Sequence, residues 1–122
     1  MEKRPEISEA ELEIMKVLWA KKLPMSVQAI CDDMVDTEWK YSTVATLLGR
    51  LAKKGAIEGK KKGYLYFYKT LLDEQEYKIS QAKKFVSKLY DGSVKKLVAS
   101  LYENKELSDK DIAELKKLFD LK

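Results

Sequence analysis

The chain has 122 residues, 45% hydrophobic and 36% charged, which suffices for one ordinary domain or two very small ones and excludes a multidomain enzyme. Cys31 is the single cysteine and histidine is absent, so we expect no intrachain disulfide, no metal or cofactor site and no enzymatic activity. The formal net charge is +4, and the sequence shows neither a signal peptide nor an apolar run long enough to cross a membrane, which predicts a soluble, cytoplasmic protein.

Two short amphipathic helices are predicted first. Ser8 begins a capping box followed by an apolar stripe, which predicts a helix over residues 8–21, and Pro24 prevents its continuation. Ser26 is the expected N-cap of a second helix. We interpret Cys31 as a small buried hydrophobe, because no second ligand or base accompanies it. The inward face of the second helix carries Val27, Ile30, Cys31, Met34 and Val35.

A third helix is predicted after a link over residues 36–40, and Gly55 ends it. Gly49 in mid-helix costs roughly 1 kcal/mol against alanine, which indicates close approach to another molecule. The apolar residues expected to face the core lie three or four positions apart, as on one side of a helix: Val44, Leu47, Leu48 and Leu51. The opposite face is small or hydroxylic at first and cationic later: Ser42, Thr43, Ala45, Thr46, Gly49, Arg50 and Lys53.

Over residues 56–69 the side-chain pattern repeats every two residues, as in a β-strand, instead of every three or four. This pattern predicts a β-hairpin packed on the helices. Residues 56–58 form its first strand and residues 64–68 form an aromatic second strand. Between them, Gly59-Lys60-Lys61-Lys62-Gly63 is expected to form a cationic tip.

Positive charge is concentrated in the middle of the chain. Residues 40–69 hold eight basic residues and one acidic residue, whereas residues 1–39 hold five basic and nine acidic residues. Such clustering favours a surface that meets a polyanion, with a solvated basic face as the alternative.

Three more amphipathic helices are predicted, over residues 73–90 and 93–103 and from Ser108 onward. They are too short to close a stable core by themselves, so we expect a dimerisation domain at 72–122 beside a DNA-binding domain at 1–71. The alternative is an intramolecular cap on the N-terminal domain. The expected dimer contacts are Tyr77, Phe85, Leu89, Leu97, Leu101, Ile112, Leu115, Leu118 and Phe119.

Three helices followed by a basic hairpin predict a winged helix-turn-helix domain, so the fold class is mainly α with a small β-wing. In such a domain the third helix enters the major groove of double-stranded DNA. Ser42, Thr43 and Thr46 are expected to contact bases or phosphates, and Tyr41 to contact the DNA backbone or pack the helix start. The phosphate contacts are assigned to Arg50, Lys53, Lys60, Lys61 and Lys62.

Other interpretations remain open for these residues. Ser42 and Thr43 could simply cap the third helix. Packing is the favoured interpretation of the aromatic residues Trp19, Trp39, Tyr64, Tyr66 and Tyr68. The alternative function is a winged-helix interaction module whose basic wing binds an acidic protein partner.

Several segments together carry a family resemblance: Ile7-Ser8-Glu9-Ala10-Glu11, Ile14-Met15, Leu18-Trp19, Trp39-Lys40-Tyr41-Ser42-Thr43-Val44-Ala45-Thr46-Leu47-Leu48, Arg50-Leu51, Lys53-Lys54-Gly55, Tyr66-Phe67-Tyr68, Leu107-Ser108, Ile112 and Glu114-Leu115. They resemble the penicillinase repressor and methicillin-resistance repressor family. The resemblance covers nearly the whole chain and implies a homodimeric winged-helix repressor of β-lactamase-type antibiotic-resistance genes that binds a palindromic operator. It also implies inactivation by a protease, triggered by a membrane sensor of β-lactams, and DNA contacts at Ser42, Thr43, Thr46 and Lys60 with its neighbours.

The sequence departs from this family at informative positions. Relatives often carry a longer polar or basic residue in place of Ser42 or Ala45, so their operator sequence does not transfer. The family's cleavage bond, asparagine followed by phenylalanine, falls on Ser100 and Leu101. A copper-responsive branch uses a C-terminal cysteine cluster, which a chain with Cys31 alone does not have.

Overall fold

The computed structural model describes residues 6–34 and 37–120, with the backbone alone for 118–120. Val35, an expected core residue, and the side chains of Leu118 and Phe119, two expected dimer contacts, lie outside this description. The chain divides into two compact units, Met1–Tyr77 and Lys78–Lys122. Among the described residues, no helix combines the length and the apolar character needed to cross a membrane.

The first unit begins with three helices: α1 (Glu9–Lys21), α2 (Val27–Asp33) and α3 (Tyr41–Lys53). Their bounds confirm the predicted helices. The capping box at the start of α1 is complete, because the Glu11 amide donates to Ser8 Oγ at 3.1 Å and the Ser8 amide donates to Glu11 Oε1 at 2.9 Å. Local side-chain chemistry thus fixes where α1 begins.

The apolar stripes of the three helices meet in one core, which confirms the predicted inward faces. Val27, Cys31 and Trp39 are half-buried at its edge, and Met15 is a buried member that the stripe did not include. A core closed by this unit alone gives the helices a fixed mutual arrangement. Its members from the helices are Ile14, Met15, Leu18, Trp19, Ile30, Met34, Val44, Leu47, Leu48 and Leu51.

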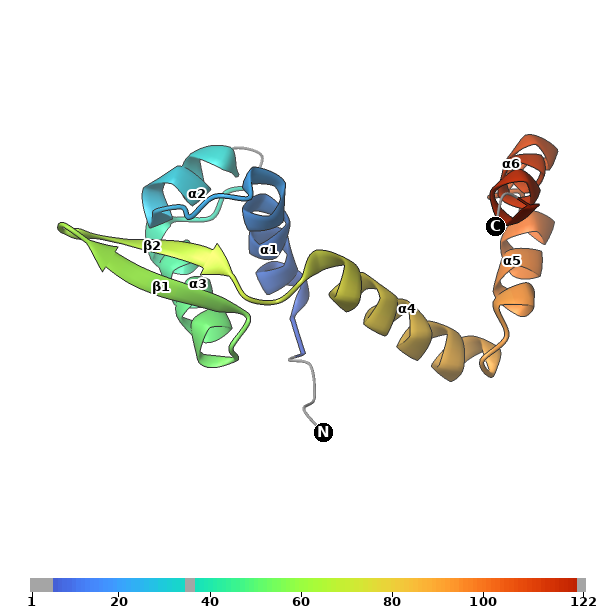
Figure 1. The fold of residues 1–122 in the computed structure, drawn as a ribbon, viewed down its shortest axis with the longest axis horizontal. Coiled ribbons are helices and arrows are strands. Elements are labelled where there is room, and N and C mark those ends of the chain that lie inside the picture. Colours follow the sequence, from blue (N-terminus) through green and yellow to red (C-terminus); the bar gives the residue numbers. More distant parts are fainter. Residues whose placement is uncertain (1–5, 35–36, 121–122) are drawn as a thin grey trace. The chain divides into compact units, whose positions relative to one another are not determined.

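The wing is an antiparallel pair of strands, β1 (Ile57–Lys62) and β2 (Leu65–Thr70), whose tip projects beyond the helices (Figure 1). The prediction of a hairpin is confirmed, but the expected lysine loop is wrong. Lys60, Lys61 and Lys62 extend β1 and pair with Phe67, Tyr66 and Leu65 of β2. The turn holds only Gly63 and Tyr64, and Gly63 has the positive φ of 67° that a two-residue hairpin turn requires.

Tyr68 joins the wing to the helices through its backbone and packs within the wing through its ring. Met25, in the turn between α1 and α2, exchanges two backbone hydrogen bonds with Tyr68, at 2.9 and 2.8 Å. The Tyr68 ring lies over Gly59 on the neighbouring strand, where a Cβ atom would come within 2.7 Å of the ring. A glycine at position 59 is therefore what lets this ring lie flat on β1.

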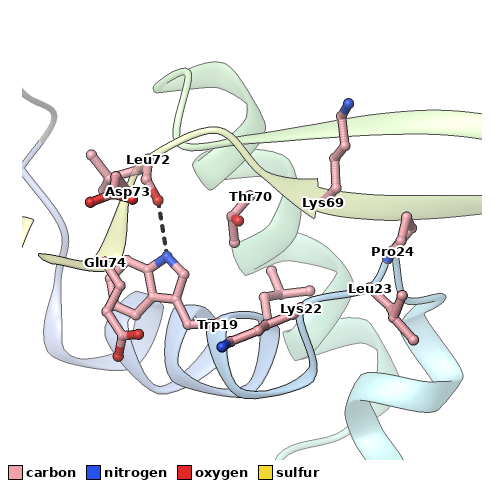
Figure 2. A pocket seen from close by; sticks show the side chains of 10 residues that line it. Trp19, Lys22, Leu23, Pro24, Lys69, Thr70, Leu72, Asp73 and Glu74 are labelled. Atoms are coloured by element: carbon pink, nitrogen blue, oxygen red, sulfur yellow. Dashed lines mark hydrogen bonds between the residues drawn. The ribbon is translucent and has the colours of Figure 1, made fainter. Parts of the chain in front are cut away.

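The first unit continues past the expected boundary at residue 71. Leu72 is buried, and its carbonyl accepts a 2.9 Å hydrogen bond from Trp19 Nε1, drawn in Figure 2. The Tyr77 ring is also buried, with its centroid 6.0 Å from that of Trp19. Tyr77 therefore belongs to the core of this unit, which corrects its assignment to the dimer surface.

Helix α4 (Glu74–Tyr90) leads into the second unit, which also contains α5 (Val94–Glu103) and α6 (Asp109–Asp120). These bounds confirm the three predicted helices. Ser93 caps α5, and Ser108 begins a capping box at the start of α6. The helices are thus defined by local signals like those of the first unit.

The described side chains of the second unit, residues 78–117, form no buried core of their own. Val86 is the only buried side chain among residues 78–117. The apolar stripe of α5 contains no buried residue, and its Val94 is 60% exposed. Within the described chain, no other element packs on the apolar faces of these helices closely enough to bury them.

Candidate nucleic-acid interface

Helix α3 turns the predicted DNA-contacting residues outward. Its leucine stripe is buried, so the opposite face is presented to solvent. Gly49 lies on this outward face, and a Cβ atom there would meet nothing within 4 Å. The exposed residues are Tyr41, Ser42, Thr43, Thr46, Arg50 and Lys53. A face that is small at its start and cationic at its end suits insertion beside a polyanion.

The N-terminus of α3 has no side-chain cap. Its N-cap residue is Lys40, no side chain accepts a hydrogen bond there, and the first turn carries no acidic residue. Capping by Ser42 or Thr43, the alternative to a DNA contact, is therefore wrong. The first amide groups of a helix and its dipole favour an anion, and among the described residues no carboxylate caps these groups in α3.

The hydroxyl groups of α3 fall into two classes. Thr46 Oγ1 donates a 2.9 Å hydrogen bond to the Ser42 carbonyl, one turn earlier in the same helix. Within the described chain, the side-chain hydroxyls of Ser42 and Thr43 form no hydrogen bond, and both residues are exposed. Ser42 and Thr43 thus offer free polar groups, while the hydroxyl of Thr46 is engaged.

The wing carries its lysines on both faces. Alternate residues of a strand point to opposite sides, so Lys60 and Lys62 share one face and Lys61 lies on the other. Lys60 Nζ lies 3.6 Å from the carboxylate of Glu58, and in the part of the chain that is described neither Lys61 nor Lys62 forms an ion pair. Acidic side chains therefore do not cover the wing.

Tyr64 is a residue that sequence reasoning misjudged. Its side chain is 100% exposed at the tip of the wing, whereas packing within the hairpin was expected. Tyr66 and Tyr68 do stack on one face of the wing, with ring centroids 6.5 Å apart. Tyr64 directly follows Gly63, and this glycine, a residue typical of turns, is the sequence signal that could have indicated its exposure.

Lys54 belongs to the basic cluster in sequence but not to the interface. Its Nζ donates to the buried carboxylate of Glu11, which is 1% exposed, and to the Glu6 carbonyl at 2.7 Å. Burial alone would raise the pKa of Glu11, but the hydrogen bond and charge of Lys54 and the hydrogen bonds from Ser8 outweigh it and lower that pKa. This ion pair ties the end of α3 to the start of α1.

A hollow at the end of α1 does not form a convergent ligand site. Figure 2 shows that the side chains of Lys22, Lys69 and Glu74 point in different directions around it. Cys31 lies elsewhere, half-buried, and burial together with the charge of Asp32 raises the pKa of its thiol. Within the described residues, no group of three or more acidic or cysteine side chains is placed to hold a metal ion.

In the second unit, α5 and α6 line an apolar groove that includes Val98, Ile112 and Leu115. Tyr102 links the two helices, because its hydroxyl donates a 2.6 Å hydrogen bond to Asp109. Of the expected dimer contacts, Phe85, Leu89 and Leu101 are exposed, and Leu97, Ile112 and Leu115 are half-buried. Ser100 and Leu101, at the expected cleavage position, lie within α5.

A closed three-helix core, an outward polar helix and a basic two-stranded wing define the class of winged-helix DNA-binding proteins. The family model described as Penicillinase repressor matches residues 7–120. The chain belongs to the penicillinase repressor family, whose members are DNA-binding transcriptional repressors and not enzymes.

Individual relatives agree with this assignment. The methicillin resistance regulatory protein MecI of Staphylococcus aureus (strain N315) is 35% identical over 117 residues, which cover 96% of this chain and 95% of MecI. The penicillinase repressor of Bacillus licheniformis is 36% identical over 115 residues, which cover 94% and 90% of the two chains.

Two solved structures resemble the first part of the chain. The solution structure of the DNA-binding domain of the repressor BlaI has a TM-score of 0.54 and 38% identity, covering 63% of this chain and 94% of that one. The monomeric form of Bacillus licheniformis BlaI in complex with the blaP half-operator has a TM-score of 0.52 and 38% identity, with the same coverage. The winged-helix fold is thus shared with a repressor solved on DNA.

Proposed function

We propose that two copies of this chain bind the two halves of a palindromic operator and thereby block transcription of resistance genes of the β-lactamase type. The observation that carries this proposal is the outward face of α3, which is free of a capping carboxylate at its start and bears Arg50 and Lys53 at its end. The BlaI complex with a half-operator supports the same use of the fold.

In this proposal α3 and the wing have different tasks. A major groove about 12 Å wide admits an α-helix, so the first turns of α3 would face base edges. Arg50 and Lys53 in the last turns, and Lys61 and Lys62 in the wing, would then contact phosphates on either side. Sequence preference comes from α3 and salt-dependent affinity from the cations.

The second unit supports the homodimer. Its amphipathic helices bury almost nothing within one chain, and the groove between α5 and α6 is lined mainly by apolar side chains such as Val98 and Ile112. A second copy carries an identical stripe, so a twofold interface would cover both. Two recognition helices about one helical turn apart would fit the two halves of a palindrome.

Relief of repression by a protease is the regulatory part of the proposal. Cleavage between Ser100 and Leu101 would cut α5 and detach α6 from the rest of the chain. The groove would lose one wall, and the dimer would weaken. A regulatory protease must first open the helix, because the bond lies within a continuous α5.

The test is a series of gel shifts at increasing salt with a duplex selected from a random library. Lys61→Ala should weaken binding to every duplex alike. It should also reduce the slope of log affinity against log salt concentration by about one for each phosphate that Lys61 neutralises. Lys83→Ala, which removes an exposed lysine of α4, is the matched control and should change neither.

The same series separates this function from the interaction-module alternative. An operator-binding dimer must prefer the selected duplex to a scrambled one of equal length. If binding shows no preference, or if Lys83→Ala reduces the salt slope as much as Lys61→Ala does, the proposed function is wrong. Sedimentation of the full chain should show a dimer at micromolar concentration.

A further inference from the structure

We propose that Thr46 recognises thymine through its methyl group rather than through its hydroxyl group. The inference rests on the proposed function, because it concerns how α3 reads the operator. Thr46 is exposed on the outward face of α3, yet its Oγ1 donates a 2.9 Å hydrogen bond to the Ser42 carbonyl. Since the hydroxyl proton is committed to the Ser42 carbonyl of the same helix, Thr46 offers the DNA no free hydrogen-bond donor, and its methyl group is available for an apolar contact.

The neighbours of Thr46 leave room for such a contact. One turn before it lie Ser42 and Thr43, and one turn after it lies Gly49, where even a Cβ atom would meet nothing within 4 Å. These small residues let the backbone of α3 approach base edges closely. A methyl group reaches only a short distance, so this close approach is what makes apolar recognition possible.

The same residues exclude the commonest polar way of reading a base. Arginine, asparagine or glutamine contacts a purine with two hydrogen bonds, and α3 has none of these before Arg50. In the major groove thymine presents a C5 methyl group, for which an apolar contact from a threonine methyl is the complementary partner. Thymine is therefore the base that fits Thr46.

Thr43 provides a comparison within the same helix. Its hydroxyl has no hydrogen-bond partner in the described chain, so it is free to bind a base or phosphate. Removing the hydroxyl should matter at Thr43, whereas removing the methyl should matter at Thr46. Thr43 would then contact DNA through its hydroxyl group and Thr46 through its methyl group.

A pair of substitutions at one position tests the protein side. Thr46→Val keeps a methyl and removes the hydroxyl, whereas Thr46→Ser keeps the hydroxyl and removes the methyl. With a duplex selected from a random library by the wild-type full chain, Thr46→Val should retain affinity within about twofold. Thr46→Ser should lose about fourfold for each half-site, the effect of one buried methyl group. Thermal melting of both variants checks that α3 remains folded.

Replacing single thymines by uracil in the same duplex tests the DNA side, because uracil lacks only the methyl group. One such replacement in each half-site should weaken wild-type binding about fourfold for each half-site. The same replacement should have no further effect with Thr46→Ser, because the two changes remove the two halves of one contact. It should retain its full effect with Thr46→Val.

The outcomes separate the inference from the proposed function. If the wild type prefers its selected duplex but no uracil replacement weakens binding, recognition by the methyl group is wrong and operator binding stands. The inference is equally wrong if Thr46→Val loses affinity while Thr46→Ser keeps it. If the wild type shows no preference for the selected duplex over a scrambled one, operator recognition itself fails and the inference fails with it.

Discussion

Helices α3 and α5 carry the same kind of sequence pattern and reach opposite structural outcomes. In α3, Val44, Leu47, Leu48 and Leu51 are all buried. In α5 the apolar residues also lie three or four positions apart, but none of them is buried. The difference lies in what surrounds each helix, because α1, α2 and the wing enclose α3, whereas no comparable set of elements encloses α5 within the described chain.

This contrast shows that an amphipathic pattern specifies a face to be covered but not what covers it. The apolar faces of the first unit are buried by residues of the same chain, so its fold should not depend on protein concentration. The second unit has apolar faces in excess of what it can bury, so its stability should depend on association. Substitutions in the first unit and substitutions in the second unit should therefore affect stability in different ways.

The largest effect is expected from deleting a core side chain of the first unit. Leu48→Ala should lower the free energy of unfolding by about 2–5 kcal/mol, because Leu48 is fully buried and its removal leaves a cavity. Leu97→Ala in α5 should cost less than about 1 kcal/mol in dilute solution, since Leu97 is only half-buried within one chain. Denaturant titration followed by far-ultraviolet circular dichroism, which reports the helices of both units, measures both.

Protein concentration distinguishes the two substitutions further. The loss caused by Leu48→Ala should be the same at all concentrations, whereas the loss caused by Leu97→Ala should grow as the wild type associates. Equal losses that are independent of concentration would contradict the division into a self-sufficient unit and an association-dependent one.

The next effect concerns association itself. Ile112→Asp places a charge in the groove between α5 and α6 and should raise the dimer dissociation constant at least about 100-fold, because burying an unpaired carboxylate is unfavourable. Ala113→Asp introduces the same side chain on an exposed position of α6 and should have little effect. Sedimentation equilibrium measures both constants, and equal constants for the two variants would place the interface elsewhere.

The local features of this fold could be predicted from the sequence. Ser8 with Glu11, and Ser108 with Asp111, are pairs three residues apart whose hydrogen bonds depend on the helix start alone. The outward face of α3 followed from its buried stripe by the same short-range geometry. Thus the helix bounds and most positions of the candidate site were accessible without a structure.

Three features were not predicted from the sequence, either because a local pattern fits more than one structure or because the contact joins distant residues. The hairpin register is set by the turn at Gly63 and Tyr64, and a lysine run with glycines at both ends fits a longer loop equally well by pattern. The pair of Lys54 and Glu11 joins residues 43 apart, which leaves no local signal. Tyr77 resembles any apolar residue of α4 until Trp19 is placed beside it.

That ion pair gives the third prediction, a pH-dependent stability of the first unit. Glu11 has a lowered pKa in the folded chain, so its contribution is complete above the unfolded value of about 4.3 and is lost as pH falls through the folded pKa. Glu11→Gln should therefore cost about 1–2 kcal/mol at neutral pH, and the gap to the wild type should narrow below pH 4. Thermal melts between pH 7 and pH 3 follow both proteins.

A carboxylate on the same helix supplies the control. Glu13 is exposed and lies 3.4 Å from Lys16, so Glu13→Gln should change stability by no more than about 0.5 kcal/mol. A gap between the wild type and Glu11→Gln that stays constant down to pH 3 would mean that the charge of Glu11 does not contribute.

The smallest effect is expected at Gly49, and its sign differs between folding and binding. Gly49→Ala should stabilise the first unit by about 1 kcal/mol, because alanine favours the helix and its Cβ meets nothing within 4 Å. Affinity for a selected duplex should nevertheless fall, since the added methyl group occupies space through which α3 approaches the DNA. Melting and gel shift on the same protein measure the two effects. Ala52→Gly, a reverse change at an exposed position of α3, should lower stability instead, and unchanged affinity for Gly49→Ala would mean that position 49 lies away from the duplex.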